Sequence, residues 1–209
     1  MASLTPADAA AFERCLAAGG VAVFPTDTVY GLACAAESPE AIRRLYALKR
    51  RRPEQPSALL FFATTDAFTA LPELGSRTCE ALLALFPGPV TLLLAQPAGR
   101  FAACYGPGGL LGLRVPALNP AIAALGAVRG PVLQSSANLS GEPEARRLAD
   151  VEAGIRAGAD LLLDGGELLG IASTVVDLAG YEAAGAWSVV REGALPAAAV
   201  AAALGSPPR

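Results

Sequence analysis

The apolar stretches of this sequence are short, and proline, glycine or a charged residue interrupts each of them. The chain has 209 residues, including 17 Pro and 22 Gly, and 53% of its residues are hydrophobic. No stretch reaches the ~18 apolar residues of a membrane-spanning helix. Asp8, Glu13 and Arg14 interrupt the N-terminal segment, so it does not resemble a signal peptide. We expect a soluble, cytoplasmic protein without membrane contacts, folded as one domain over residues 1–209.

Short apolar runs alternate with helical patterns along the chain. Strands are predicted at 21–24, 58–62, 90–95, 111–115, 132–134, 161–163, 173–178 and 187–190. Helices are predicted from Thr5 to Gly19, from Ser38 to Lys49, and at 76–85, 120–125, 149–157 and 196–204. This mixture predicts an α/β fold with helices covering an open mixed sheet, and it leaves the order of the strands open.

The absence of histidine excludes several classes of active site. Without imidazole the chain has no Ser-His-Asp or Cys-His nucleophile pair and no zinc site that contains histidine. The cysteines at 15, 34, 79 and 104 have no CxxC spacing, so we expect free thiols in a reducing compartment and no metal site. Lys49 is the only lysine among 16 basic residues, and the formal net charge of −3 argues against a general nucleic-acid binder.

Two polar segments directly follow predicted strands. The segment PTDTVYGL (25–32) places hydroxyls, a carboxylate and a phenol at a strand end, where they suit a small polar ligand or a hydrogen-bonded turn. The segment QSSANLSG (134–141) suits a phosphate or ribose contact, or a helix cap. Both segments therefore leave a structural and a functional interpretation open.

Clustered or isolated cations mark two more candidate sites. Lys49 to Arg52 are four consecutive cations. The dipole of the preceding helix accounts for one or two of them, and a polyphosphate or RNA would account for the rest. Arg114 lies alone inside an apolar strand pattern, so it pairs either with an acidic side chain or with an anionic ligand.

Seven segments together resemble, in order, the YrdC-type threonylcarbamoyl-AMP synthases over about residues 21–193. They are PTDTVYGL (25–32), LKRRRPEQP (48–56), FPGPVTLLL (86–94), LRVPALNP (113–120), SSANLSGEP (135–143), STVVDL (173–178) and VVREG (189–193). The resemblance implies a single YrdC-like domain, a twisted open α/β sheet with a positively lined concave cleft. It also implies formation of threonylcarbamoyl-AMP and pyrophosphate from L-threonine, bicarbonate or CO2, and ATP that carries Mg²⁺. Partner proteins would then modify position 37 of tRNA.

The resemblance also implies a nucleotide site. Lys49 and Arg51 match the KxR pair of the family, and Ser136 and Asn138 match its SxN pair. These residues, with Arg191 near the nucleotide, are implied to hold ATP, and Lys49 and Arg51 are the implied catalytic pair. Because the carbamate of threonine is itself the nucleophile toward the α-phosphate, the implied reaction needs no histidine base.

The implied threonine site consists of Thr26, Arg114 and Ser173, with Arg114 opposite the carboxylate. The sequence departs from the family in several places. The strand at 58–62, which includes Leu60, lacks the histidine of some relatives, Ala172 replaces a glutamate, Gln55 replaces Asn or Lys, and Ser57 replaces leucine.

Two other functions remain open at this point. One is a YrdC-like protein without this activity that binds tRNA or double-stranded RNA in a basic cleft, through Arg43, Arg44 and the cations at 49–52. The other is a carbamoyl-adenylate enzyme that serves a different pathway.

Overall fold

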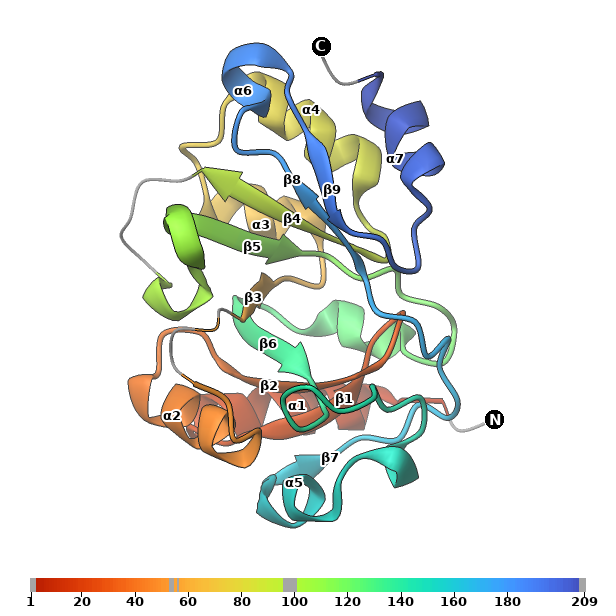
Figure 1. The fold of residues 1–209 in the computed structure, drawn as a ribbon. Coiled ribbons are helices and arrows are strands. Elements are labelled where there is room, and N and C mark those ends of the chain that lie inside the picture. The colour runs from red at the N-terminus through yellow and green to blue at the C-terminus, as the bar shows by residue number, and fades with distance from the viewer. Residues whose placement is uncertain (1–2, 53–54, 56, 96–100, 207–209) are drawn as a thin grey trace.

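The computed structural model describes residues 3–52, 55, 57–95 and 101–206. Strands in this part of the chain form one nine-stranded sheet (Figure 1). The strands are β1 Ala22–Pro25, β2 Tyr30–Ala35, β3 Ala58–Leu60, β4 Val90–Ala95, β5 Leu110–Arg114, β6 Val132–Ser136, β7 Leu161–Leu162, β8 Thr174–Asp177 and β9 Ser188–Arg191. Their order is β7-β1-β2-β6-β3-β5-β4-β8-β9.

The sheet is mixed, as the sequence predicts. The pairs β1–β7, β3–β5 and β4–β8 are parallel, and the remaining neighbours are antiparallel. β6 lies between β2 and β3 and joins the N-terminal strands to the β3–β5–β4 part of the sheet. The sheet therefore brings segments that are far apart in the sequence next to one another.

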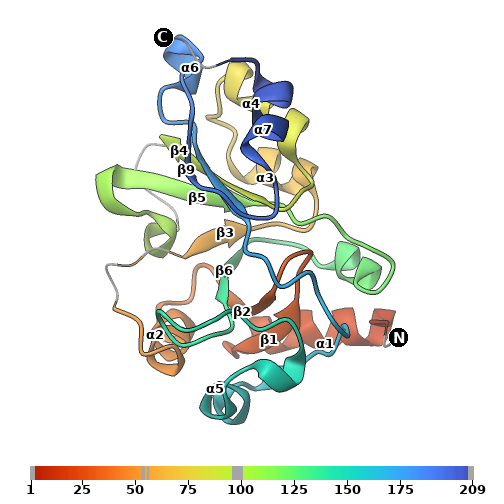
Figure 2. The same cartoon turned by 45° about the vertical axis from the view of Figure 1, so that its right-hand side comes forward.

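Helices pack at the two ends of the row of strands, beside the first and the last strands of the sheet (Figure 2). The α-helices are α1 Pro6–Ala17, α2 Pro39–Leu48, α3 Thr64–Ala70, α4 Ser76–Leu85, α5 Ala153–Gly158, α6 Tyr181–Ala184 and α7 Ala197–Leu204. The 3-10 helices are η1 Ala102–Cys104, η2 Pro107–Gly109, η3 Ala123–Ala127 and η4 Leu148–Asp150. Within the described residues no helix has the length and apolar character needed to cross a membrane.

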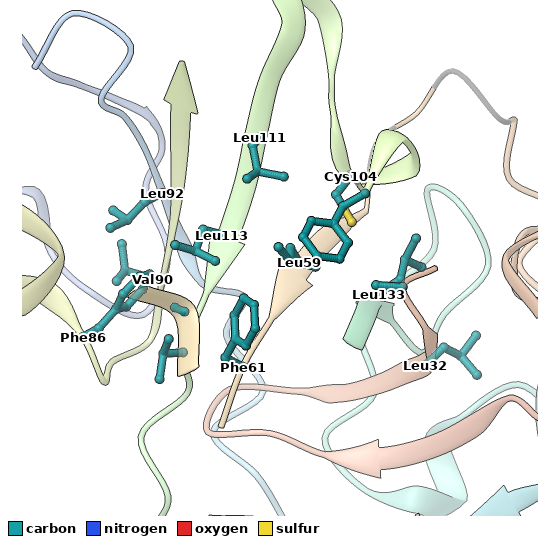
Figure 3. Packing of buried hydrophobic residues seen from close by; sticks show 14 of the residues in the cluster. Leu32, Leu59, Phe61, Phe86, Val90, Leu92, Cys104, Leu111, Leu113 and Leu133 are labelled. Carbon is teal, nitrogen blue, oxygen red and sulfur yellow. The ribbon is translucent and has the colours of Figure 1, made fainter. Parts of the chain in front are cut away.

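Alternating side chains of the central strands enter two different hydrophobic clusters. Leu59 and Phe61 pack in one cluster with Leu32 and Leu133 (Figure 3). Leu60 belongs to the other cluster, which α1 and η3 cover on the opposite side. Because successive residues of a strand point to opposite faces, one apolar run supplies both cores.

Each predicted strand is confirmed, with ends that differ by two residues or fewer, but β2 is not among the predicted strands. The sequence predicts a polar loop at 25–32, whereas the chain re-enters the sheet at Tyr30. From Tyr30 to Cys34 every residue is buried on both faces of the sheet, so the segment shows no polar alternation. The polar loop is therefore only the short turn between β1 and β2.

The helix predicted at 120–125 is a short 3-10 helix, and it begins later than predicted, at Ala123. Asn119 Oδ1 accepts a hydrogen bond from the Ala121 amide at 2.9 Å, and the 3-10 helix η3 follows at Ala123–Ala127. Residues 120–122 therefore form a turn that the Asn119 side chain stabilises. The helix predicted at 149–157 is divided between η4 and α5, and α3 and α6 were not predicted.

Candidate functional site

A cavity of about 330 Å³ lies against the part of the sheet formed by β3, β4, β5, β6, β8 and β9. Its wall gathers polar side chains from segments that are distant in the sequence. These are Arg51, Ser57, Thr91, Arg114, Gln134, Ser135, Ser136, Glu144, Ser173 and Arg191. Among these described wall residues three are arginines and one is a carboxylate, a balance that suits an anionic ligand.

Arg114 is the last residue of β5, and its side chain is buried. Its Nη2 donates to Asp27 Oδ1 at 2.7 Å and to Thr28 Oγ1 at 2.5 Å. Its Nη1 makes a long contact of 3.5 Å with Gln134 Oε1. Of the two partners that the sequence left open for this arginine, the acidic side chain is therefore present, and Arg114 also reaches the cavity wall.

Thr26 lies behind the cavity, inside the turn between β1 and β2. Its side chain is fully buried, and its hydroxyl donates to Val29 O at 2.7 Å and lies 3.0 Å from Thr28 Oγ1. The hydroxyl also accepts from the Thr28 and Val29 amides. Thr26 therefore shapes the turn that presents Asp27 and Thr28 to Arg114, and it does not line the cavity wall.

Lys49 is the C-cap of α2, and only 1% of it is exposed. Its ammonium donates to the carbonyl oxygens of Ser136 and Asn138 and to Asn138 Oδ1 at 3.3 Å. Burial, together with the positive charge of Arg51, lowers the pKa of Lys49 to about 7, and Glu144 acts in the opposite direction. A buried amine of this kind is characteristic of functional sites, although ion-pair networks also produce it.

Arg51 reaches the cavity wall that Lys49 does not reach. Arg50, between them, has a left-handed φ of 49°, so the chain turns sharply at the end of α2. Arg51 Nη1 donates to Ser135 Oγ at 3.0 Å, and Nε donates to Gln55 O at 3.3 Å. Burial lowers the pKa of the Arg51 guanidinium.

The turn after β6 contains Ser136 and Asn138. Ser136 Oγ donates to Asn138 Oδ1 at 2.6 Å, and the side-chain Nδ2 of Asn138 donates to Glu142 O. Ser136 lines the cavity, while Asn138 stabilises the turn together with Lys49. The KxR and SxN segments are thus one hydrogen-bonded unit.

Ser173 and Arg191 form the opposite part of the wall. Arg191 Nη2 donates to Ser173 O at 2.8 Å, and Ser173 Oγ lies 2.8 Å from Thr91 Oγ1. β8 and β9 are antiparallel neighbours, which explains how residues of two motifs meet here.

The structure therefore brings five predicted site residues to one cavity: Arg51, Arg114, Ser136, Ser173 and Arg191. Lys49, Thr26 and Asn138 lie directly behind this wall and hold it. Pro53, Glu54 and Pro56 of the predicted basic loop lie outside the described residues.

Three features of the wall add to the sequence analysis. Glu144, which was not predicted, is the only carboxylate among the described wall residues. It follows the SxN segment by a few positions, and no pattern in the sequence marks it. Of the departures from the family pattern, Ser57 and Ala172 line the cavity, whereas Leu60 belongs to the core beneath α1.

Comparisons with known proteins identify similar sequences and similar folds. The model of the Sua5/YciO/YrdC family, described as telomere recombination, matches residues 14–193. A threonylcarbamoyl-AMP synthase of Xanthomonas campestris is 36% identical over 154 residues, which are 72% of this chain and 81% of the relative. The human threonylcarbamoyl-AMP synthase is 33% identical over 190 residues, which are 85% of this chain and 64% of the relative.

Solved structures share the fold. Pyrococcus abyssi Sua5 complexed with L-threonine has a TM-score of 0.83 at 25% identity over 98% of this chain. The match covers 59% of the Pyrococcus chain, so the present chain spans about three fifths of that protein. Escherichia coli YciO, at 24% identity, shows the same fold with a TM-score of 0.77 and 92% coverage of both chains.

Proposed function

The chain belongs to the Sua5/YciO/YrdC family, and on that premise we propose that it is an L-threonylcarbamoyladenylate synthase. This nucleotidyltransferase forms threonylcarbamoyl-AMP and pyrophosphate from L-threonine, bicarbonate or CO2, and ATP. The observation that carries the proposal is the single cavity to which Arg51, Arg114 and Arg191 converge from three separate motifs. The relatives named threonylcarbamoyl-AMP synthase support the choice of reaction.

In this proposal the nucleotide lies along the KxR–SxN side of the cavity. Arg51 and Ser136 line the wall there, Arg191 lines the opposite part of the wall, and together they offer the charges and hydroxyl that bind phosphate oxygens. Lys49 adds a positive charge behind them and holds the turn of Ser136 and Asn138 in place. Pre-organised donors of this kind stabilise the charge that develops during phosphoryl transfer.

The amino acid lies on the side of Arg114 and Ser173. Arg114 offers its guanidinium to the carboxylate of threonine, and Ser173 supplies a hydroxyl to the same region. Thr26 contributes indirectly, because it shapes the turn beside Arg114. The Pyrococcus structure with L-threonine supports an amino acid as ligand.

The chemistry requires positioning more than acid–base catalysis. The amine of threonine reacts with CO2 to form a carbamate and release a proton. A carbamate oxygen then attacks the α-phosphorus of ATP, and the bond from that phosphorus to the bridging oxygen of pyrophosphate breaks. Holding both substrates in line is the main task left to the protein, and a chain without histidine can perform it.

Magnesium enters this proposal as part of the ATP substrate. In the part of the chain that the structure describes, no three His, Cys, Asp or Glu side chains cluster as a metal site. Mg²⁺ commonly keeps several waters and binds substrate phosphates with one or two carboxylates. Glu144 lines the cavity and fits that requirement.

We place the product upstream of tRNA modification at position 37, in the cytoplasm, with separate proteins that transfer the threonylcarbamoyl group. The RNA-binding alternative rests on the exposed cations Arg43, within α2, and Arg50 and Arg52, after its end. These cations lie outside the cavity wall, so they can contact RNA whether or not the cavity is catalytic.

One assay separates these functions. ATP consumption is followed with threonine and bicarbonate, each omitted in turn, with and without tRNA. The proposed synthase releases pyrophosphate only with both co-substrates and without a need for tRNA. A protein that only binds RNA shows no threonine-dependent release, and an enzyme of another pathway prefers a different amine.

A further inference from the structure

The carboxylate of Asp27 is bound at both of its oxygens. Oδ1 accepts from Arg114 Nη2 at 2.7 Å, and Oδ2 accepts from the Ala117 amide at 3.0 Å. The side chains of Arg114 and Asp27 are only 4% and 8% exposed. Asp27 therefore ties the turn after β1 to the segment after β5, in a place where water does not compete for either charge.

Asp27 also determines which part of Arg114 remains available. The Nη2 group has two hydrogens, and Asp27 and Thr28 accept them. Within the described structure Nε has no hydrogen-bond partner, and Nη1 has only the 3.5 Å contact with Gln134. Because Arg114 lines the cavity, Nη1 is the donor whose hydrogen bonds a ligand there can complete.

We propose that Asp27 is a positioning residue for amino-acid binding, which holds Arg114 Nη2 so that Nη1 meets the carboxylate of the substrate. The inference rests on the proposed function. An arginine side chain has several rotatable bonds, and ordering it during binding costs affinity. A permanent partner at Nη2 removes that cost, because the orientation exists before the substrate arrives.

The test is the substitution Asp27→Asn, which keeps the size of the side chain. Asparagine can still accept a hydrogen bond from Nη2, but its amide nitrogen would then face the Ala117 N–H, donor against donor. We expect the KM for threonine to rise at least about tenfold, the lower range for losing one charged hydrogen bond. The KM for ATP and the kcat at saturating threonine should stay near the wild-type values.

Asp160→Asn is the matched control. Asp160 Oδ2 also accepts from a backbone amide, Val21 N at 2.7 Å, and from an arginine, Arg44 Nη2 at 2.9 Å. This pair is about 40% exposed and lies away from the cavity wall. The control therefore removes the same type of interaction, and its KM for threonine should equal that of the wild type.

The outcomes distinguish this inference from the function on which it rests. If the wild type shows no threonine-dependent pyrophosphate release, the proposed function fails and the inference fails with it. If the wild type is active and a folded Asp27→Asn variant keeps its KM for threonine, the inference alone is overturned. A crystal structure of the variant provides a second readout: Arg114 displaced from its wild-type position supports the inference, and an unmoved Arg114 contradicts it.

Discussion

The Nζ of Lys49 lies 2.7 Å from the carbonyl oxygen of Asn138, a residue 89 positions later in the chain. The backbone makes a second link, since the Ser140 amide donates to Lys49 O at 3.2 Å. One residue thus fastens the end of α2 to the turn after β6 through both its side chain and its main chain. The side of the cavity where we propose that the nucleotide binds depends on this connection.

Replacing Lys49 should therefore impair catalysis strongly. Lys49→Met keeps most of the apolar stem but removes the charge and all three hydrogen bonds. We expect turnover to fall on the order of 10²–10³-fold, the scale for losing one pre-organised electrostatic group. Threonine-dependent pyrophosphate release measures the effect. Arg129→Ala, which removes an exposed cation far from the cavity, should retain full activity.

Lys49 should also make stability depend on pH. Its pKa in the folded protein, about 7, lies below the ordinary value of 10.5, so between these values the unfolded chain binds more protons. Stability rises with pH where the unfolded state binds more protons. The wild type should therefore gain stability relative to Lys49→Met from pH 7 to pH 10 in urea unfolding. A difference that stays constant or shrinks would contradict a buried amine with a lowered pKa.

Arg114 should control the affinity for threonine and not that for ATP. Arg114→Lys keeps a positive charge but loses the planar set of donors, which one ammonium cannot replace. The KM for threonine should rise at least about tenfold, consistent with the loss of one or more charged hydrogen bonds. Steady-state kinetics with each substrate varied in turn measures this. An unchanged KM would place the carboxylate elsewhere in the cavity.

Thr174 should contribute to stability through the turn that follows β9. Its buried hydroxyl donates to Leu195 O at 2.5 Å and accepts from the amides of Gly193 and Leu195. Thr174→Val leaves these groups without a partner and should cost about 1–3 kcal/mol in the free energy of unfolding. Thr69→Val removes an exposed hydroxyl bonded within α3 and should cost less than about 0.5 kcal/mol. Equal losses would contradict the role of the buried turn.

The sequence predicts the strands well because most of them are apolar runs that end at proline, glycine or charge. β2 could not be predicted from the sequence because its residues Tyr30–Ala35 are nearly all buried and follow a polar turn without a break. The order of the sheet could not be predicted, since it depends on pairings between distant segments, such as Leu32 with Ser135. Local patterns contain no information on such pairings.

The candidate site was predicted as a set of residues but not as an arrangement. Lys49 and Arg51 are equivalent cations in the sequence, and only the left-handed turn at Arg50 sends one behind the wall and the other into it. The partners of Asp27 and Glu144 could not be predicted either. A carboxylate in a loop gives no local signal of the partner that it will meet across the sheet.

The central claim is that the cavity joins threonine, CO2 and ATP. The most direct measurement is mass spectrometry of the product formed from ¹³C-bicarbonate, L-threonine and ATP, with pyrophosphate quantified in parallel. We expect threonylcarbamoyl-AMP that contains one ¹³C atom, with one pyrophosphate released for each molecule of this product. ATP that binds to the protein but gives no labelled adenylate with threonine would contradict it.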